Sequence, residues 1–237
     1  MKIIRVMFLF TSILISYVGN VFPLQPPAKG RIPVAIAVTD NANVIDLAGP
    51  LEVFQDVMIP SRGKTEAEQL AFQVYLVGES RSPVTIASGV QIVPNSTFDD
   101  APIPKVLVVG AQMGGPKLKA WIQKVYQDHA NDVVMSVCTG AFKLAGAGLL
   151  DGKPATTHHE FYDQFNTMFP QVRLLKGQRF VQSDQKIFTA GGLTSGIDLA
   201  LHIVQLYFGE SVAEQTAAHM EYQGTAWKTQ VSSNPAH

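Results

Sequence analysis

Cysteine is nearly absent from this chain, since Cys138 is the only one among 237 residues. A single cysteine cannot form a disulfide within its own chain, which excludes a fold held together by internal disulfides. Three roles remain for the thiol at this point. It is a buried inert side chain, a cross-link between two molecules, or a reactive group.

Charge is also scarce, and neither sign dominates. Charged residues make up 16% of the chain, and 18 basic against 19 acidic residues give a formal net charge of −1. A nucleic-acid-binding domain normally shows a basic patch or stripe, so the composition predicts no nucleic-acid partner. Hydrophobic residues reach 46%, which is ample for a buried core. No repeat or Gly/Ser linker interrupts the chain, so we predict one domain over residues 30–228 and a flexible polar tail over residues 229–237.

The start of the chain lacks an apolar run long enough to cross a membrane. Residues 6–18 form an uncharged, largely apolar run of about 13 residues, shorter than the ~20 residues of a spanning helix. A short basic segment precedes this run and a Pro-rich stretch follows it, which is the order of a secretory signal peptide. Residues 1–28 are therefore predicted to be a signal peptide and leader of an exported, periplasmic protein with no stable membrane span after cleavage. An uncleaved N-terminal anchor is the alternative.

After the leader, short apolar runs alternate with amphipathic segments. This pattern predicts buried strands at 32–38, 70–78, 105–110 and 132–138, hairpins at 84–97 and 180–191, and helices at 46–58, 115–130, 139–150, 161–170, 196–209 and 211–222. Strands separated by helices indicate an α/β fold whose mostly parallel sheet is covered on both faces. Ligands of such sheets bind beyond the carboxyl ends of the strands. The loops of interest are therefore 40–46, 110–115, 137–140 and 191–196.

The cysteine lies at one of these strand ends, in the stretch DVVMSVCTGAF (132–142). A buried strand that turns into a small-residue helix at Cys138 is similar to a nucleophile elbow. The amides and the positive dipole end at the start of the helix favour a thiolate, and the same amides suit a negative charge developing on a substrate. The alternative is an ordinary buried cysteine at the end of a strand.

Four stretches resemble the ThiJ/PfpI superfamily, which has the class I glutamine amidotransferase-like fold. They are VIDLAGPLEVF, VLVVGAQMGG, VVMSVCTGAFKLAGAGLLDGKPATTHH and FTAGGLTSGIDLALHIV, and they keep the family's order over nearly all of the chain after the leader. The D-L-x-G-P-x-E-V-F and C-T-G motifs resemble the branch of isonitrile hydratases and AraC-type sensor domains. The resemblance implies a flavodoxin-like three-layer sandwich with a mostly parallel sheet and a nucleophile elbow.

Carried over by motif position, the resemblance implies a role for several residues. Cys138 matches the nucleophile, and Asp46 matches an acidic residue that faces the thiol. A carboxyl group kept neutral by burial can donate a hydrogen bond to a thiolate and shuttle a proton. From the residues alone, Asp46 is equally well placed to be a helix N-cap. The amides of Ala111, in the loop that begins at Gly110, and of Thr139 match the oxyanion site.

The residue after the nucleophile separates the branches of the superfamily. Thr139 stands where the protease-like branch carries a histidine. The usual Cys–His pair is therefore missing, which disfavours peptidase, deglycase and glyoxalase activities and favours a hydratase.

Two further motifs could suggest ligands. The neighbouring His158 and His159 are not joined by a cysteine or a carboxylate cluster at metal-ligand spacing, so no metal site is predicted. Neighbours on an extended chain point apart, and only His158 is expected to line a pocket. The Gly-rich segment 189–196 lacks the lysine of a P-loop and the spacing of a dinucleotide fingerprint. We therefore expect no cofactor.

Two functions follow from the resemblance. The first is a cofactor-independent hydratase in which Cys138 attacks an isonitrile, and water releases an N-substituted formamide. The second is a non-catalytic periplasmic protein that binds a ligand or senses oxidative stress through Cys138. The expected partners are a small-molecule substrate and a second copy of the chain in a homodimer. Because the chain ends at residue 237, we expect no DNA-binding domain of the AraC type.

Overall fold

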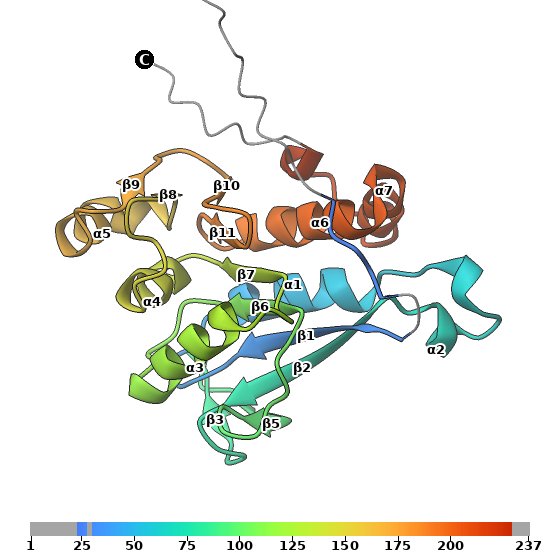
Figure 1. The fold of residues 1–237 in the computed structure, drawn as a ribbon, viewed down its shortest axis with the longest axis horizontal. Coiled ribbons are helices and arrows are strands. Elements are labelled where there is room, and N and C mark those ends of the chain that lie inside the picture. The colour runs from blue at the N-terminus through green and yellow to red at the C-terminus, as the bar shows by residue number, and fades with distance from the viewer. Residues whose placement is uncertain (1–22, 28–29, 229–237) are drawn as a thin grey trace, which may run out of the picture.

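A seven-stranded sheet forms the centre of the molecule, in the order β10-β11-β7-β6-β1-β2-β5 (Figure 1). The computed structural model describes residues 23–27 and 30–228. Most of the predicted signal peptide and all of the predicted tail at 229–237 therefore lie outside the described residues. The strands of the sheet are β1 (Ile32–Ala37), β2 (Phe72–Gly78), β5 (Ser96–Thr97), β6 (Val106–Val109), β7 (Val133–Ser136), β10 (Phe180–Gln182) and β11 (Ile187–Ala190).

The sheet is parallel except at one edge. Neighbouring strands from β5 to β11 pair in parallel, and β10 pairs with β11 in the antiparallel sense. The five strands β2-β1-β6-β7-β11, counted in chain order, follow the 2-1-3-4-5 order of flavodoxin-like doubly wound sheets. This confirms the predicted fold class. The strand order reverses between β1 and β6, so a ligand crevice is expected beyond the carboxyl ends of these two strands.

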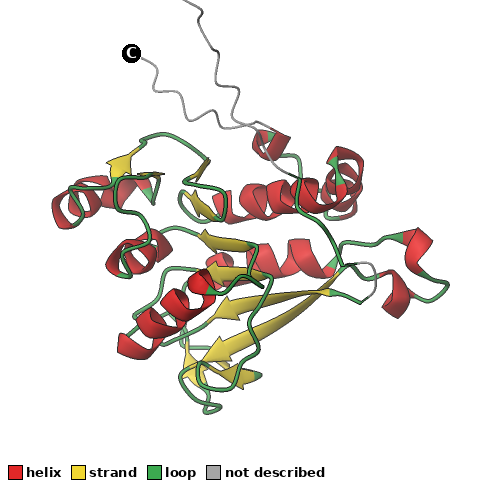
Figure 2. Cartoon of the chain, in the orientation of Figure 1, coloured by secondary structure: helices red, strands yellow, loops and turns green. Residues whose placement is uncertain are grey.

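Helices cover both faces of the sheet (Figure 2). The α-helices are α1 (Val44–Gln55), α2 (Glu66–Gln69), α3 (Pro116–Gln127), α4 (Gly140–Gly146), α5 (Tyr162–Met168), α6 (Ser195–Phe208) and α7 (Glu210–His219). Three short 3₁₀ helices are η1 (Pro60–Arg62), η2 (His159–Phe161) and η3 (Ala226–Lys228). Within the described residues, none of the helices has the length and apolar character needed to cross a membrane.

The central strands are apolar throughout because both of their faces are buried. Successive side chains of a strand point to opposite faces. In β6, Val106 and Val108 join the core that contains the buried side chains of α1 and α6. Leu107 and Val109 join the second core, which contains those of α3 and α4. This alternation separates two hydrophobic cores and produces the three layers.

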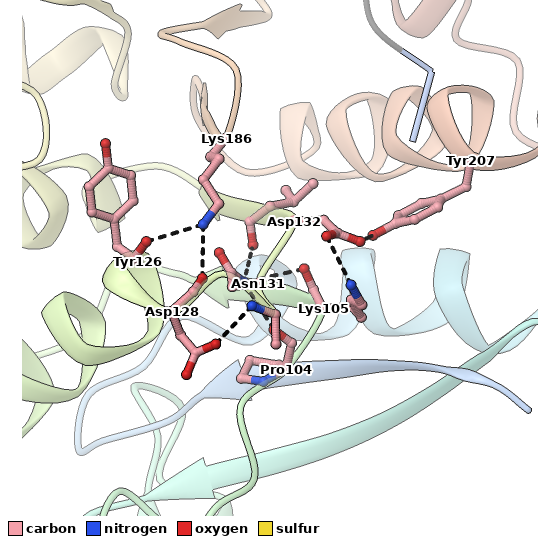
Figure 3. A network of polar contacts seen from close by, with 10 residues as sticks. Pro104, Lys105, Tyr126, Asp128, Asn131, Asp132, Lys186 and Tyr207 are labelled. Carbon is pink, nitrogen blue, oxygen red and sulfur yellow. Dashed lines mark hydrogen bonds and ion pairs between the residues drawn. The ribbon is translucent and has the colours of Figure 1, made fainter. Parts of the chain in front are cut away.

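Polar contacts tie the amino-terminal ends of the central strands together (Figure 3). Asp132, just before β7, accepts from Lys105 Nζ at 3.0 Å and from the Tyr207 hydroxyl at 2.9 Å. The Asn131 side-chain amide donates to three backbone carbonyls within 3.0–3.2 Å. Lys186, before β11, donates to two more. The loops of interest lie at the opposite, carboxyl-terminal ends of the strands, and these loops form the site.

The shortest strands were predicted only in part. β3 (Val84–Thr85) and β4 (Gln91–Ile92) form the expected antiparallel hairpin, but β5 leaves it to join the main sheet. β8 (Pro154–Ala155) and β9 (Arg173–Leu174) pair in parallel. Strands of two residues are too short to show a hydrophobic period, so pattern alone does not reveal them.

Candidate active site

The site begins at a sharp turn after β7. Cys138 has a φ of 58°, in the left-handed region that residues other than glycine seldom adopt. Its N–H donates to the Gly191 carbonyl at 2.8 Å, and its carbonyl accepts from Thr157 Oγ1 at 2.9 Å. These two bonds hold the residue in a strained conformation between a strand and a helix. The predicted nucleophile elbow is therefore present.

The small residues after the cysteine allow a close approach of α4 to the sheet. A Cβ atom at Gly140 would lie 2.0 Å from the carbonyl oxygen of Val109, which no real side chain tolerates. Glycine therefore lets the first turn of α4 rest directly on the end of β6. Cys138, at the tip of the turn, is only 5% exposed.

Asp46 is fully buried in the first turn of α1, beyond the end of β1. The N-cap of this helix is Asn43, whose side chain accepts from the N–H of Ile45 at 3.3 Å. The N-cap interpretation of Asp46 is therefore wrong. Instead, its Oδ2 accepts from the Ala111 N–H at 2.9 Å, and its Oδ1 has no hydrogen-bond partner among the described residues.

The structure brings Asp46 and Cys138 close enough for each to shift the pKa of the other. Burial raises the pKa of Asp46 to about 6, while the Ala111 N–H and the Cys138 thiol oppose this rise. Burial, and next the negative charge of Asp46, raise the pKa of Cys138 to about 11. No direct hydrogen bond of standard geometry joins the two side chains. Near neutral pH the pair is therefore a thiol beside a largely ionised carboxylate.

This protonation state corrects the prediction of a thiolate beside a neutral carboxyl group. The amides of Thr139 and Leu193 and the Thr139 hydroxyl do favour a negative sulfur, but burial outweighs them. The helix that follows has only seven residues, so its dipole is weak. A carboxylate beside a protonated thiol can instead act as a general base.

The two amides predicted to form an oxyanion site are both directed at the catalytic pair. The Ala111 N–H donates to Asp46, and the Thr139 N–H is directed at the Cys138 thiol. The Ala111 amide is therefore engaged by Asp46, and the oxyanion role of the two amides stays a prediction. Gly110 has a spatial role instead, since a Cβ atom there would lie 2.8 Å from the Cβ of Asp46.

His158 lies at the start of η2 beside the loop after β11. Its Nδ1 accepts from the Glu160 N–H at 3.3 Å. Its ring stacks on that of His159, with centroids 4.6 Å apart and planes 25° apart. The expectation that these neighbours point apart is wrong, because the chain turns into a 3₁₀ helix at this point. Both rings line one cavity. Among the described residues, no group of three or more His, Cys, Asp or Glu side chains is arranged to hold a metal ion.

Sequence reasoning missed two contributors to the site. Thr157 holds the backbone of the elbow, and the N–H of Leu193 is directed at the thiol. Leu193 has a φ of 54°, a second strained residue beside the nucleophile. The Gly-rich segment 189–196 was recognised as a loop near the site. Nothing in its pattern distinguishes the one amide that meets the sulfur.

Comparisons with known proteins agree with this architecture. The DJ-1/PfpI family matches residues 33–206. The chain is 34% identical over 182 residues to isonitrile hydratase of Pseudomonas putida, which covers 75% of this chain and 73% of that enzyme. It is 25% identical over 205 residues to the HTH-type transcriptional regulator GbdR of Pseudomonas aeruginosa, and spans 53% of the length of that regulator.

Solved structures share the fold. A THiJ/PfpI family protein from Pseudomonas syringae superposes with a TM-score of 0.67 at 25% identity, over 92% of this chain and 83% of that chain. DJ-1beta of Drosophila melanogaster superposes with a TM-score of 0.62 at 16% identity, over 81% of this chain and 98% of that chain. With its flavodoxin-like sheet, its elbow cysteine and the match over residues 33–206, the chain belongs to the DJ-1/PfpI family.

Proposed function

We propose that this protein is a cysteine-dependent hydratase that adds water to an isonitrile and releases an N-substituted formamide. The observation that carries the proposal is the pairing of the strained, buried Cys138 with the buried Asp46 carboxylate, from a distant part of the chain. The 34% identity to an isonitrile hydratase, over about three quarters of both chains, supports the same chemistry.

The first step joins the thiol to the terminal carbon of the isonitrile. Asp46 takes the proton from the sulfur as the S–C bond forms, and returns this proton to the same carbon. The product is a thioimidate, R–N=CH–S–Cys. Because the pKa values of the two groups are about 11 and about 6, complete proton transfer before attack would be uphill by less than about 7 kcal/mol. The cost is smaller than the difference in pKa values implies, because Asp46 no longer repels the thiolate once it has taken up the proton. Attack that is concerted with proton transfer avoids this separate uphill step.

The second step releases the product. Water adds to the C=N carbon, with one proton passing through Asp46 to the nitrogen. The C–S bond of the resulting adduct then breaks, the sulfur regains a proton, and R–NH–CHO leaves. The sum is isonitrile plus water to formamide, with no oxidation or reduction. Donors from Thr139 and Leu193 stabilise the sulfur while it carries negative charge.

The test is formation of a formamide by the purified protein from cyclohexyl isocyanide, followed by NMR. Cys138→Ala and Asp46→Asn should each lower kcat at least ~10²-fold, because one removes the nucleophile and the other the base. Asp163→Asn is the matched control, since it makes the same change on a carboxyl group that is 99% exposed. Full activity in either site variant, or no formamide from aliphatic and aromatic isonitriles alike, contradicts the proposal.

The sensing role is the weaker of the two candidates. Cysteine oxidation follows thiolate character and exposure. Cys138 is 5% exposed, and its pKa is raised to about 11 by burial, so it has little of either property. Mild peroxide is therefore expected to leave Cys138 largely unmodified.

A further inference from the structure

A cavity of about 360 Å³ adjoins the elbow on the side of the loop after β11. Two of its lining residues hydrogen-bond to the backbone of Cys138, and a third lies beside its thiol. Thr157 donates to the Cys138 carbonyl, Gly191 accepts from its N–H, and the Leu193 amide is directed at its sulfur. A group bound in this cavity would therefore lie next to the backbone of the elbow.

One wall of the cavity is flat and aromatic. It consists of the stacked rings of His158 and His159, together with Tyr162. The ring of His158 lies directly on Gly192, where a Cβ atom would lie 2.2 Å from its Cδ2. The absence of a side chain at Gly192 therefore leaves room for the imidazole. Phe161 packs edge-on against the same ring. Flat walls of this kind favour a planar group bound face to face or edge to face.

The rest of the lining offers hydrogen-bond donors and one positive charge. Arg179 lines the cavity and donates through Nη2 to Thr194 Oγ1 at 3.2 Å. Its guanidinium is held by the buried Asp198, which lies outside the lining. No carboxyl group belongs to the lining, and the nearby Glu160 is 69% exposed. Because Asp198 already pairs with the charge of Arg179, the lining is better suited to a hydrogen-bond acceptor than to a cation.

We propose that this cavity binds the substituent on the isonitrile nitrogen, and that it selects aromatic substituents carrying a carboxylate. This inference rests on the proposed hydratase activity. A cavity of this volume falls within the range of small-molecule sites, roughly 300–1,000 Å³. The aromatic ring lies against the imidazole wall, and the carboxylate accepts from the donors on the Arg179 side.

The kinetic test compares 4-isocyanobenzoate with cyclohexyl isocyanide. The aryl carboxylate should have at least ~10-fold higher kcat/KM. His159→Ala should raise its KM ~5-fold or more, leave kcat within about twofold, and raise the KM of the aliphatic substrate by a smaller factor. Arg179→Lys keeps a cation beside Asp198 and should also raise the KM of the aryl carboxylate alone. His129→Ala is the matched control, since it removes an exposed histidine far from the elbow.

A binding test separates this inference from the proposed activity. Calorimetry on Cys138→Ala protein measures 4-formamidobenzoate against N-cyclohexylformamide, with and without His159→Ala. Binding of the aryl carboxylate that His159→Ala weakens, in a protein whose wild type has no hydratase activity, would support the cavity and overturn the hydratase. Hydratase activity with equal preference for both substrates, or a preference that neither variant changes, would overturn the cavity inference alone. Absence of both activity and binding overturns both.

Discussion

At the level of single residues, the chemistry of the site depends on one proton held between Asp46 and Cys138. Burial raises both pKa values, but it raises that of Cys138 to about 11 and that of Asp46 only to about 6. The order of the two values decides which group holds the proton in the resting protein. It assigns the thiol form to the cysteine and the base to the aspartate.

This order predicts how the thiol titrates. Because Cys138 is the only cysteine, its rate of alkylation by iodoacetamide reports on a single site. In the wild type the rate should keep rising well above pH 9, since the pKa of Cys138 is raised to about 11. Asp46→Asn removes a negative charge and should move this pKa downward. Asp163→Asn should leave it unchanged. A wild-type thiol that titrates below pH 9 would contradict the assignment of Asp46 as the base.

At the level of elements, the site depends on how closely α4 approaches the end of β6. The helix α4 and the strand β6 were both predicted from their patterns, and so was the turn that joins β7 to α4. The small residues after Cys138 also predict tight packing of the helix on the sheet. The atom that Gly140 meets was not predictable, because the carbonyl of Val109 is 31 residues away in the chain and its position follows from the sheet register. Sequence patterns report neighbours along a chain, whereas this contact joins separate elements.

Two glycines of the same helix test this contact. Gly140→Ala places a Cβ atom 2.0 Å from the Val109 carbonyl oxygen, so it should destabilise the fold by about 3 kcal/mol or more, as overpacking against backbone does. Gly146→Ala has nothing within 4 Å of its added Cβ and should be neutral or stabilising by up to about 1 kcal/mol. Urea unfolding measures both. Equal effects of the two substitutions would show that the elbow does not need the close approach.

At the scale of the whole molecule, the buried and ionised Asp46 lowers the free energy of unfolding. Its pKa is raised from 3.8 to about 6 by burial, so the folded state binds more protons than the unfolded state between these pH values. The stabilising contribution of the protonated Asp46 is fully present below the pKa that this group has in the unfolded chain. It is lost as the pH rises through about 6. The loss amounts to about 3 kcal/mol at 1.36 kcal/mol per pKa unit.

The difference in unfolding free energy between Asp46→Asn and the wild type measures this loss. Asparagine does not titrate, so the difference should rise in favour of the variant by about 3 kcal/mol from pH 3.5 to pH 7.5. Denaturant unfolding at each pH gives the values. A flat difference for Asp46→Asn would mean that burial does not destabilise the ionised carboxyl group.

The sequence by itself determined the layers of the fold and the place of the thiol. Strand and helix periods, the C-T-G turn and the resemblance to the ThiJ/PfpI superfamily are local features, readable in order along the chain. The predicted export signal lies largely outside the described residues and stays a prediction. Only the tertiary structure decided that Asp46 is buried beside Cys138 rather than acting as a helix cap, and that the Ala111 amide donates to it. It also decided that two adjacent histidines share one cavity. These outcomes depend on burial and on distances between segments far apart in the chain, and both arise only when the sheet brings the strand ends together.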